Sequence, residues 1–158
     1  MNGNPDVIHL LNAVLTHELT AINQYFVHAK MLEDWGYTPL GRVKWNKSIV
    51  AMKEAEKVIE RILFLDGVPN LQRLNPVRGG ESAQEMHELD LALGLEGRDQ
   101  LEAGIKLCQE KLDHVSREHL ESLLEQEEED IDWHEAQLHQ LGEIGKENYL
   151  ASWLHDDG

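Results

Sequence analysis

The sequence predicts an all-α protein, a bundle of four long helices that ends in a short fifth helix. Apolar residues recur at helical spacing over long stretches, whereas long alternating runs of β-branched residues are absent. All four prolines fall near the edges of these periodic stretches, where a helix tolerates them. A chain of 158 residues is long enough for one substantial core, so a single domain over residues 1–158 is expected.

The first helix is predicted to begin after Asn4-Pro5 and to run to about Asp34, because proline is tolerated in a first helical turn. A short turn over residues 35–39 follows, so the first two helices should be antiparallel neighbours. The inward stripe of the first helix is Leu11, Val14, Leu15, Glu18, Ile22, Tyr25 and Ala29.

The second helical stretch, residues 44–66, carries two apolar stripes and no glycine or proline before its end. The inner stripe is Ala51, Ala55, Val58, Ile62 and Leu65. The outer stripe is Trp45, Ile49, Met52, Ile59 and Leu63. One stripe suffices for a helix to reach its own core, so the outer stripe predicts a contact with another chain or a flat cofactor.

The connection over residues 66–80 is too long for a tight hairpin and predicts a crossover along the bundle. The third helix should span residues 82–111, with Ser82 at a capping-box spacing from Glu85. The fourth should span about residues 113–141, with the stripe Leu120, Leu123, Leu124, Glu127, Ile131, His134, Leu138 and Leu141.

The glycines of the third helix and the shortness of the fifth helix each call for an explanation. Gly94, Gly97 and Gly104 each cost the third helix roughly 1 kcal/mol relative to alanine, which predicts a packing requirement or a lost function. Residues 146–153 form a short fifth helix, expected to dock in a contact between subunits because it is too short to stand alone. Its apolar residues are Tyr149, Leu150 and Trp153.

The composition narrows the class of partner. A formal net charge of −16 argues against nucleic acid or an anionic membrane and is compatible with cations. The single cysteine, Cys108, excludes an internal disulfide and favours a reducing compartment. No signal peptide and no apolar run of about 20 residues is apparent, so a cytoplasmic location is expected.

Glu18 and Glu127 each occupy a position where the helical period calls for an apolar residue. A buried carboxylate is costly unless it is paired or binds a metal; the alternative is that the stripe is misphased and the carboxylates lie at the solvent boundary. A di-iron bundle also needs a Glu-x-x-His pair on each of two helices, and none of the nine histidines has a glutamate three residues earlier. Spacing alone therefore encodes no complete di-iron site.

Other candidate ligands have ordinary explanations. Met52 has a thioether that can bind haem iron, but a helical methionine more often fills a core or an interface. His17, His28 and His134 are also candidates, but histidines at such positions more often make ordinary hydrogen bonds or lie exposed than bind a metal. Cys108 is interpreted as a small buried hydrophobe.

Five stretches, residues 18–31, 59–72, 90–93, 131–133 and 148–150, together make the chain resemble the bacterioferritins over essentially its whole length. The resemblance implies a ferritin-like four-helix bundle, assembled into a hollow shell of twenty-four subunits that stores ferric mineral. It also implies a haem b between two-fold-related subunits, each giving one methionine. Its reductant would be the small bacterioferritin-associated ferredoxin.

Met52 matches the haem-ligand position of that family. The residues that would wall the haem are Leu19, Ile22, Asn23, Phe26, Trp45 and Ile49. The ferroxidase centre departs from the family: of its six ligand positions, the chain keeps Glu18 and Glu127. The four substituted positions hold Ala51, Glu54, Gly94 and Asp130, and the inner-surface iron site holds Asn46 and Val50 instead of a histidine and an aspartate.

Three functions remain open at this point. The first is an iron-storage subunit that binds haem and has a degenerate ferroxidase centre, with a ferroxidase-competent bacterioferritin subunit as partner. The second is a ferroxidase with a remodelled, carboxylate-only metal site, in which Glu18, Glu54, Glu127 and Asp130 hold one hard cation. The third is a shell protein of ferritin-like fold that sheathes another cargo and binds no haem.

Overall fold

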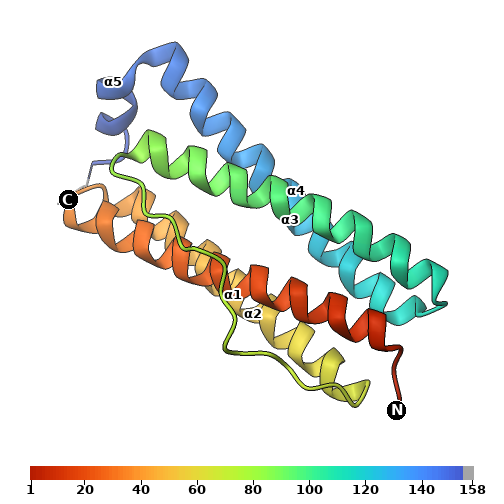
Figure 1. Ribbon diagram of the computed structural model, residues 1–158. Helices are drawn as coiled ribbons and strands as arrows, with labels where there is room; N and C mark the ends of the chain where they lie inside the picture. Colours follow the sequence, from red (N-terminus) through yellow and green to blue (C-terminus); the bar gives the residue numbers. More distant parts are fainter. Residues whose placement is uncertain (155–158) are drawn as a thin grey trace.

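Four long helices and one short helix make up a computed structural model that describes residues 1–154 (Figure 1). Their bounds are α1 Pro5–Asp34, α2 Thr38–Phe64, α3 Ala83–Glu110, α4 His114–Ile144 and α5 Lys146–Ala151. The helices pair as two hairpins, α1 with α2 and α3 with α4, packed into one bundle. The predicted all-α bundle is confirmed, and no strand occurs among the residues described.

Local capping explains where the helices begin and end. The side chain of Ser82 accepts a hydrogen bond from the Glu85 amide at 3.1 Å, so the predicted cap is confirmed. The second helix ends at Phe64, two residues short of the predicted end, and Asp66 beyond it has a positive φ of 61°. The fourth helix continues to Ile144, three residues past its predicted end, because Gly145 and not Gly142 carries the positive φ of 82° that stops it.

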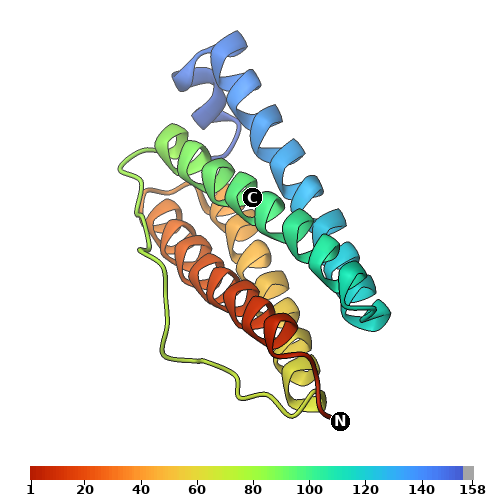
Figure 2. The ribbon, with the colours of Figure 1, turned by 45° about the vertical axis from the view of Figure 1, so that its right-hand side comes forward.

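The crossover between α2 and α3 runs along the outside of α1, as Figures 1 and 2 show. Side chains of α1 at helical spacing hold it there. Asn12 donates to the carbonyl of Val68 at 3.1 Å, and Thr20 accepts from the amide of Asn75 at 3.0 Å. His28 accepts from the amide of Gly80 at 3.0 Å. The predicted crossover is therefore fastened along the whole length of the bundle.

The core is divided along the bundle axis. One apolar cluster, which includes Leu11 and Ile62, fills the end near the α2–crossover junction. A second apolar cluster fills the end near α5 and contains Leu32, Leu40 and Tyr149. Between them the bundle interior carries buried charged and polar residues, and these form the sites described below.

The fifth helix is anchored in the bundle of its own chain, and its expected contact with another subunit stays a prediction. Tyr149 is fully buried in its own bundle, within the cluster that includes Leu40, so this residue needs no neighbouring subunit to cover it. The helix ends at Ala151, and Trp153 lies just beyond it.

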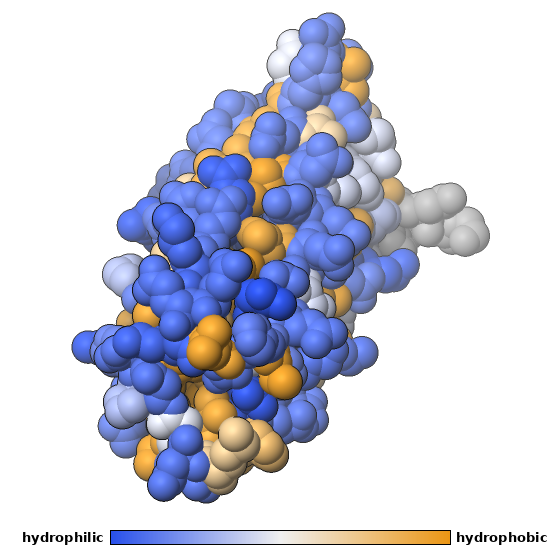
Figure 3. Space-filling model, turned by 90° about the vertical axis from the view of Figure 1, so that its right-hand side faces the viewer, coloured by the Kyte–Doolittle hydropathy of each residue, from blue (hydrophilic) through white to orange (hydrophobic). Residues whose placement is uncertain are grey.

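The surface agrees with the strongly acidic composition. The face in Figure 3 is mostly hydrophilic, with apolar side chains gathered in a strip along its middle. Within residues 1–154, no helix combines the length and the apolarity that crossing a membrane requires.

Candidate functional site

The outer stripe of α2 and the adjoining side of α1 form an exposed apolar surface, here called the outer face. It consists of Leu19, Ile22, Asn23, Phe26, Trp45, Ile49 and Met52. Met52 is 50% exposed, and the rings of Phe26 and Trp45 lie 5.4 Å apart between centroids. Ser48 donates to the carbonyl of Ile22 at 2.8 Å, which fixes the register of the two helices beneath this face.

The two carboxylates singled out in the sequence both lie inside the bundle. Glu18 is 2% exposed, and the Glu127 side chain is 11% exposed. Burial raises the pKa of Glu18 well above its usual range, and the neighbouring carboxyls of Glu54 and Glu127 raise it further. Burial likewise raises the pKa of Glu54 to about 7. The stripes were correctly phased, and the bundle interior holds several carboxyl groups close together.

His17 joins these carboxylates, which the sequence did not predict. Its Nε2 lies 3.7 Å from Oε2 of Glu127, and the ligand atoms of His17, Glu18 and Glu127 all lie within 4.8 Å of one another. Gly97 of α3 makes this possible, since a Cβ there would sit 2.5 Å from Nε2 of His17 and 2.9 Å from Oε2 of Glu127. The signal in the sequence was the unexplained helical glycine, together with the position of His17 next to Glu18.

Asp130 is engaged elsewhere. Its Oδ1 accepts from Nζ of Lys47 at 2.7 Å, and the Lys47 ammonium also lies 4.8 Å from the centroid of the Trp133 ring. Ala51 is buried among Tyr25 and other apolar residues. The four-carboxylate set of Glu18, Glu54, Glu127 and Asp130 is therefore altered, since a lysine pairs with one member and a histidine approaches another.

The remaining substituted positions lie in distinct surroundings. Gly94 faces the carboxylates, because a Cβ there would lie 3.4 Å from Oε1 of Glu127. Asn46 and Val50 both lie exposed on α2.

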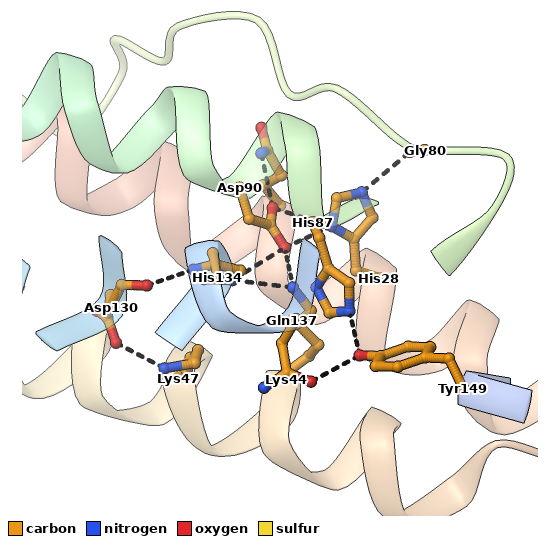
Figure 4. A network of polar contacts seen from close by, with 11 residues as sticks. His28, Lys44, Lys47, Gly80, His87, Asp90, Asp130, His134, Gln137 and Tyr149 are labelled. Carbon is orange, nitrogen blue, oxygen red and sulfur yellow. Dashed lines mark hydrogen bonds and ion pairs between the residues drawn. The ribbon is translucent and has the colours of Figure 1, made fainter. Parts of the chain in front are cut away.

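A buried polar network lies beside this cluster, toward α5 (Figure 4). Asp90 is at its centre and is fully buried. It accepts hydrogen bonds from Gln24 at 2.9 Å, from Nδ1 of His28 at 3.0 Å and from Nζ of Lys44 at 2.7 Å. Burial alone would raise the pKa of Asp90, but the Lys44 ammonium and His28 outweigh it and hold the pKa below its usual range.

The hydrogen bonds assign the tautomer of each histidine in the network. Nε2 of His28 accepts from Gly80, so its Nδ1 carries the proton given to Asp90. The ring of His134 donates from Nδ1 to the Asp130 carbonyl, which leaves Nε2 to accept from Lys44 at 3.0 Å. Burial lowers the pKa of His134 to about 2, so this histidine is neutral near pH 7.

The network reaches the fifth helix through His87. The Tyr149 hydroxyl donates to Gln137 at 2.7 Å and accepts from Nε2 of His87 at 2.8 Å. This leaves Nδ1 of His87 as a buried acceptor without a protein partner. Burial lowers the pKa of His87 to about 2. His87 and His134 are thus placed to act as neutral hydrogen-bonding groups.

The four-helix bundle and the carboxylates in its interior are features of a ferritin-like protein. The ferritin-like domain family matches residues 8–144 of the chain. A bacterioferritin of Mycobacterium leprae is 48% identical over 96% of this chain and 95% of that protein. Bacterioferritin BfrA of Mycobacterium tuberculosis is 46% identical over the same shares, and a bacterioferritin of Streptomyces coelicolor is 44% identical over 96% of this chain and 91% of that protein. The chain belongs to the bacterioferritin family of ferritin-like proteins.

Proposed function

We propose that the chain is a subunit of a twenty-four-subunit bacterioferritin shell that stores iron and binds haem b through Met52, between two-fold-related subunits. The observation that carries the haem assignment is the outer face, where Met52 is 50% exposed among apolar side chains. A thioether is a suitable axial ligand for haem iron, and an exposed apolar surface of this kind favours a partner that covers it.

The residues of the outer face fit a flat, largely apolar group. Phe26 and Trp45 offer aromatic surface, while Leu19, Ile22 and Ile49 offer aliphatic surface. When bound, haem supplies a one-electron redox centre, through which bacterioferritin-associated ferredoxin would reduce the stored mineral. The residues of this chain hold the group at the interface and exclude water from it.

Substitution of Met52 by leucine is expected to abolish the Soret absorption band of protein prepared with excess haem. Leucine preserves the apolar surface but removes the sulfur ligand. Met31→Leu is the matched control, because Met31 packs against the cluster near α5 and is expected to leave the band unchanged. If wild-type protein prepared with excess haem showed no Soret band, the third function, a shell protein that sheathes another cargo and binds no haem, would be favoured instead.

We further infer that the ferroxidase centre is degenerate and that a ferroxidase-competent bacterioferritin subunit supplies oxidation in a mixed shell. Three observations support this. Ala51 and Gly94 offer no side-chain ligand, and the ammonium of Lys47 takes an oxygen of Asp130. A positive charge at 2.7 Å from a carboxylate opposes the binding of a cation there.

The alternative, a ferroxidase with a remodelled carboxylate site, differs in its oxidation kinetics. Homopolymeric shells loaded anaerobically with Fe(II) and then exposed to oxygen are expected to show no fast stoichiometric oxidation phase. A fast phase that disappears in Glu127→Ala would establish the alternative and contradict the degenerate centre.

A further inference from the structure

We propose that the end of the crossover is held to α1 in a pH-dependent way, and that protonation of His28 releases the residues around Gly80 from the bundle. The rest of the crossover stays attached, because the side chains that hold it do not titrate. Release opens a cavity that this part of the crossover lines. The behaviour depends on neither haem nor iron.

Four side chains on one side of α1 accept hydrogen bonds from backbone amides of the crossover. The last of them is the imidazole of His28, whose Nε2 lies 3.0 Å from the Gly80 nitrogen. The other three are Asn12 with the amide of Asn70 at 2.8 Å, Thr20 with that of Asn75 at 3.0 Å and Gln24 with that of Arg78 at 3.3 Å. Amide and hydroxyl oxygens accept at any ordinary pH, so His28 is the one acceptor of the four that a proton can remove.

Both ring nitrogens of His28 are engaged, as Figure 4 shows. Nδ1 donates to Asp90 at 3.0 Å, so the lone pair of the neutral ring lies on Nε2, where it meets the Gly80 amide. An imidazolium carries a proton on each nitrogen and has no acceptor. A second proton would therefore set two N–H groups against each other at 3.0 Å, and the bond to Gly80 would be lost.

The charges around the ring act in both directions. The Asp90 carboxylate favours the imidazolium, whereas the Lys44 ammonium, 2.7 Å from the same carboxylate, opposes it. The titratable and charged groups around His28 and its carboxylate partner are Asp90 and His87 of α3, Lys44 of α2 and His134 of α4, with Arg78 and Glu81 exposed on either side of Gly80 in the chain. Because residues 78 and 79 are exposed, water can reach Nε2 once Gly80 moves away. Hydration of the imidazolium then offsets the lost hydrogen bond.

The release is confined to one end of the crossover. Asn12 holds the beginning with two hydrogen bonds, one to the carbonyl of Val68 and one from the amide of Asn70. Most crossover residues are exposed and form no regular structure, and segments of this kind open locally at low cost. Loss of one of the few attachments near Gly80 therefore frees that end without unfolding the bundle.

The freed end lines a cavity of about 160 Å³ between α1 and α3. Asn75, Pro76 and Arg78 contribute the crossover side of this cavity, and Gln24 contributes part of the α1 side. Gln24 also donates to Asp90 at 2.9 Å, so it connects the cavity with the buried polar network. The crossover thus acts as a strap that closes over the cavity near neutral pH and opens it to solvent in acid.

The test is hydrogen–deuterium exchange of the purified protein at about pH 7.5 and about pH 5, the range in which histidine ordinarily changes its charge. Exchange is resolved to single amides by mass spectrometry and corrected for its intrinsic dependence on pH. In wild-type protein, protection of the Gly80 amide is expected to fall about tenfold or more in acid, while protection of the Asn70 amide changes less than about twofold. In His28→Gln the acid response of Gly80 should disappear, because glutamine can accept from Gly80 and donate to Asp90 but does not titrate.

His9→Gln is the matched control, since His9 is an exposed histidine on the same helix, and it should keep the wild-type response. Unchanged protection of Gly80 in wild-type protein, or the same acid response in His28→Gln as in His9→Gln, would overturn the proposal. Equal loss at Asn70 and Gly80 would also contradict it, because that result indicates unfolding of the whole chain. The comparison of these two amides is made in wild-type protein, so the test holds even if His28→Gln does not fold. Neither haem nor iron enters the measurement, and its failure would leave the proposed function untouched.

Discussion

Replacement of Asp90 by asparagine is expected to lower the free energy of unfolding by about 3–5 kcal/mol, the range for breaking a buried ion pair. The Lys44 ammonium is fully buried and would lose the carboxylate that lies 2.7 Å from its Nζ. Gln24 and His28 would lose part of the same acceptor. Denaturant unfolding at fixed protein concentration measures the loss, because the proposed shell assembly would add to stability in a concentration-dependent way.

The control for this substitution is Asp99→Asn on the same helix. Asp99 is exposed and lies 3.6 Å from Arg98, a surface pair worth at most about 1 kcal/mol. The double variant Lys44→Met with Asp90→Asn removes both charges and keeps an amide oxygen that can accept from Gln24 or His28, so it should recover part of the lost stability. If Asp90→Asn were as stable as Asp99→Asn, the interior pair would contribute no more than a surface pair, contrary to this expectation.

The helices and the crossover followed from the sequence because they depend on local chemistry. Periodic apolar residues specify a helix and its buried side, and Ser82 specifies a helix start. The burial of Glu18 followed from the same period, as did that of Cys108. Each of these features is determined by residues close together in the chain.

The composition of the interior clusters did not follow, because it depends on which side chains of different helices meet. Lys44 lies seven residues before Ala51 and so continues the inner stripe of α2, a signal that a lysine stem crosses the core. That its ammonium would reach Asp90 of α3 depends on helix packing, which no single helix specifies. The same holds for His17, whose approach to Glu127 of α4 requires the absence of a side chain at Gly97 of α3.

The two interior clusters should respond to pH in opposite directions. The carboxyl of Glu54, with its pKa raised to about 7 by burial, keeps a proton in the folded state that the unfolded chain releases above its ordinary pKa of 4.5. Glu54 therefore lowers stability as the pH rises from about 4.5 to about 7. Burial lowers the pKa of His87 and of His134, so these two histidines act in the reverse sense. Comparison of matched variants separates their contribution from that of Glu54.

Substitution of His87 by glutamine is expected to make the protein less sensitive to acid, by about 2 kcal/mol at pH 5 relative to pH 7.5. Burial lowers the pKa of His87 from 6.5 to about 2, so below pH 6.5 the unfolded chain takes up a proton that the folded chain refuses. Its stabilising contribution is complete above pH 6.5 and is lost progressively as the pH falls toward 2. Glutamine removes this titration, while its amide group can still donate to the Tyr149 hydroxyl.

The measurement is the difference in unfolding free energy between variant and wild type at the two pH values, which cancels the contribution of the carboxyl cluster. His139→Gln is the matched control, because the side chain of His139 is 75% exposed and should give a difference near zero. Equal pH responses for the two variants would mean that His87 is protonated in the folded state near pH 5. A protonated ring would leave its Nδ1–H without a hydrogen-bond acceptor among the residues described, and the nearby Lys44 ammonium opposes a second positive charge there. His87 is therefore neutral in the folded protein and takes up a proton only on unfolding. Its hydrogen bond with Tyr149 links α5 to the polar network of the bundle interior.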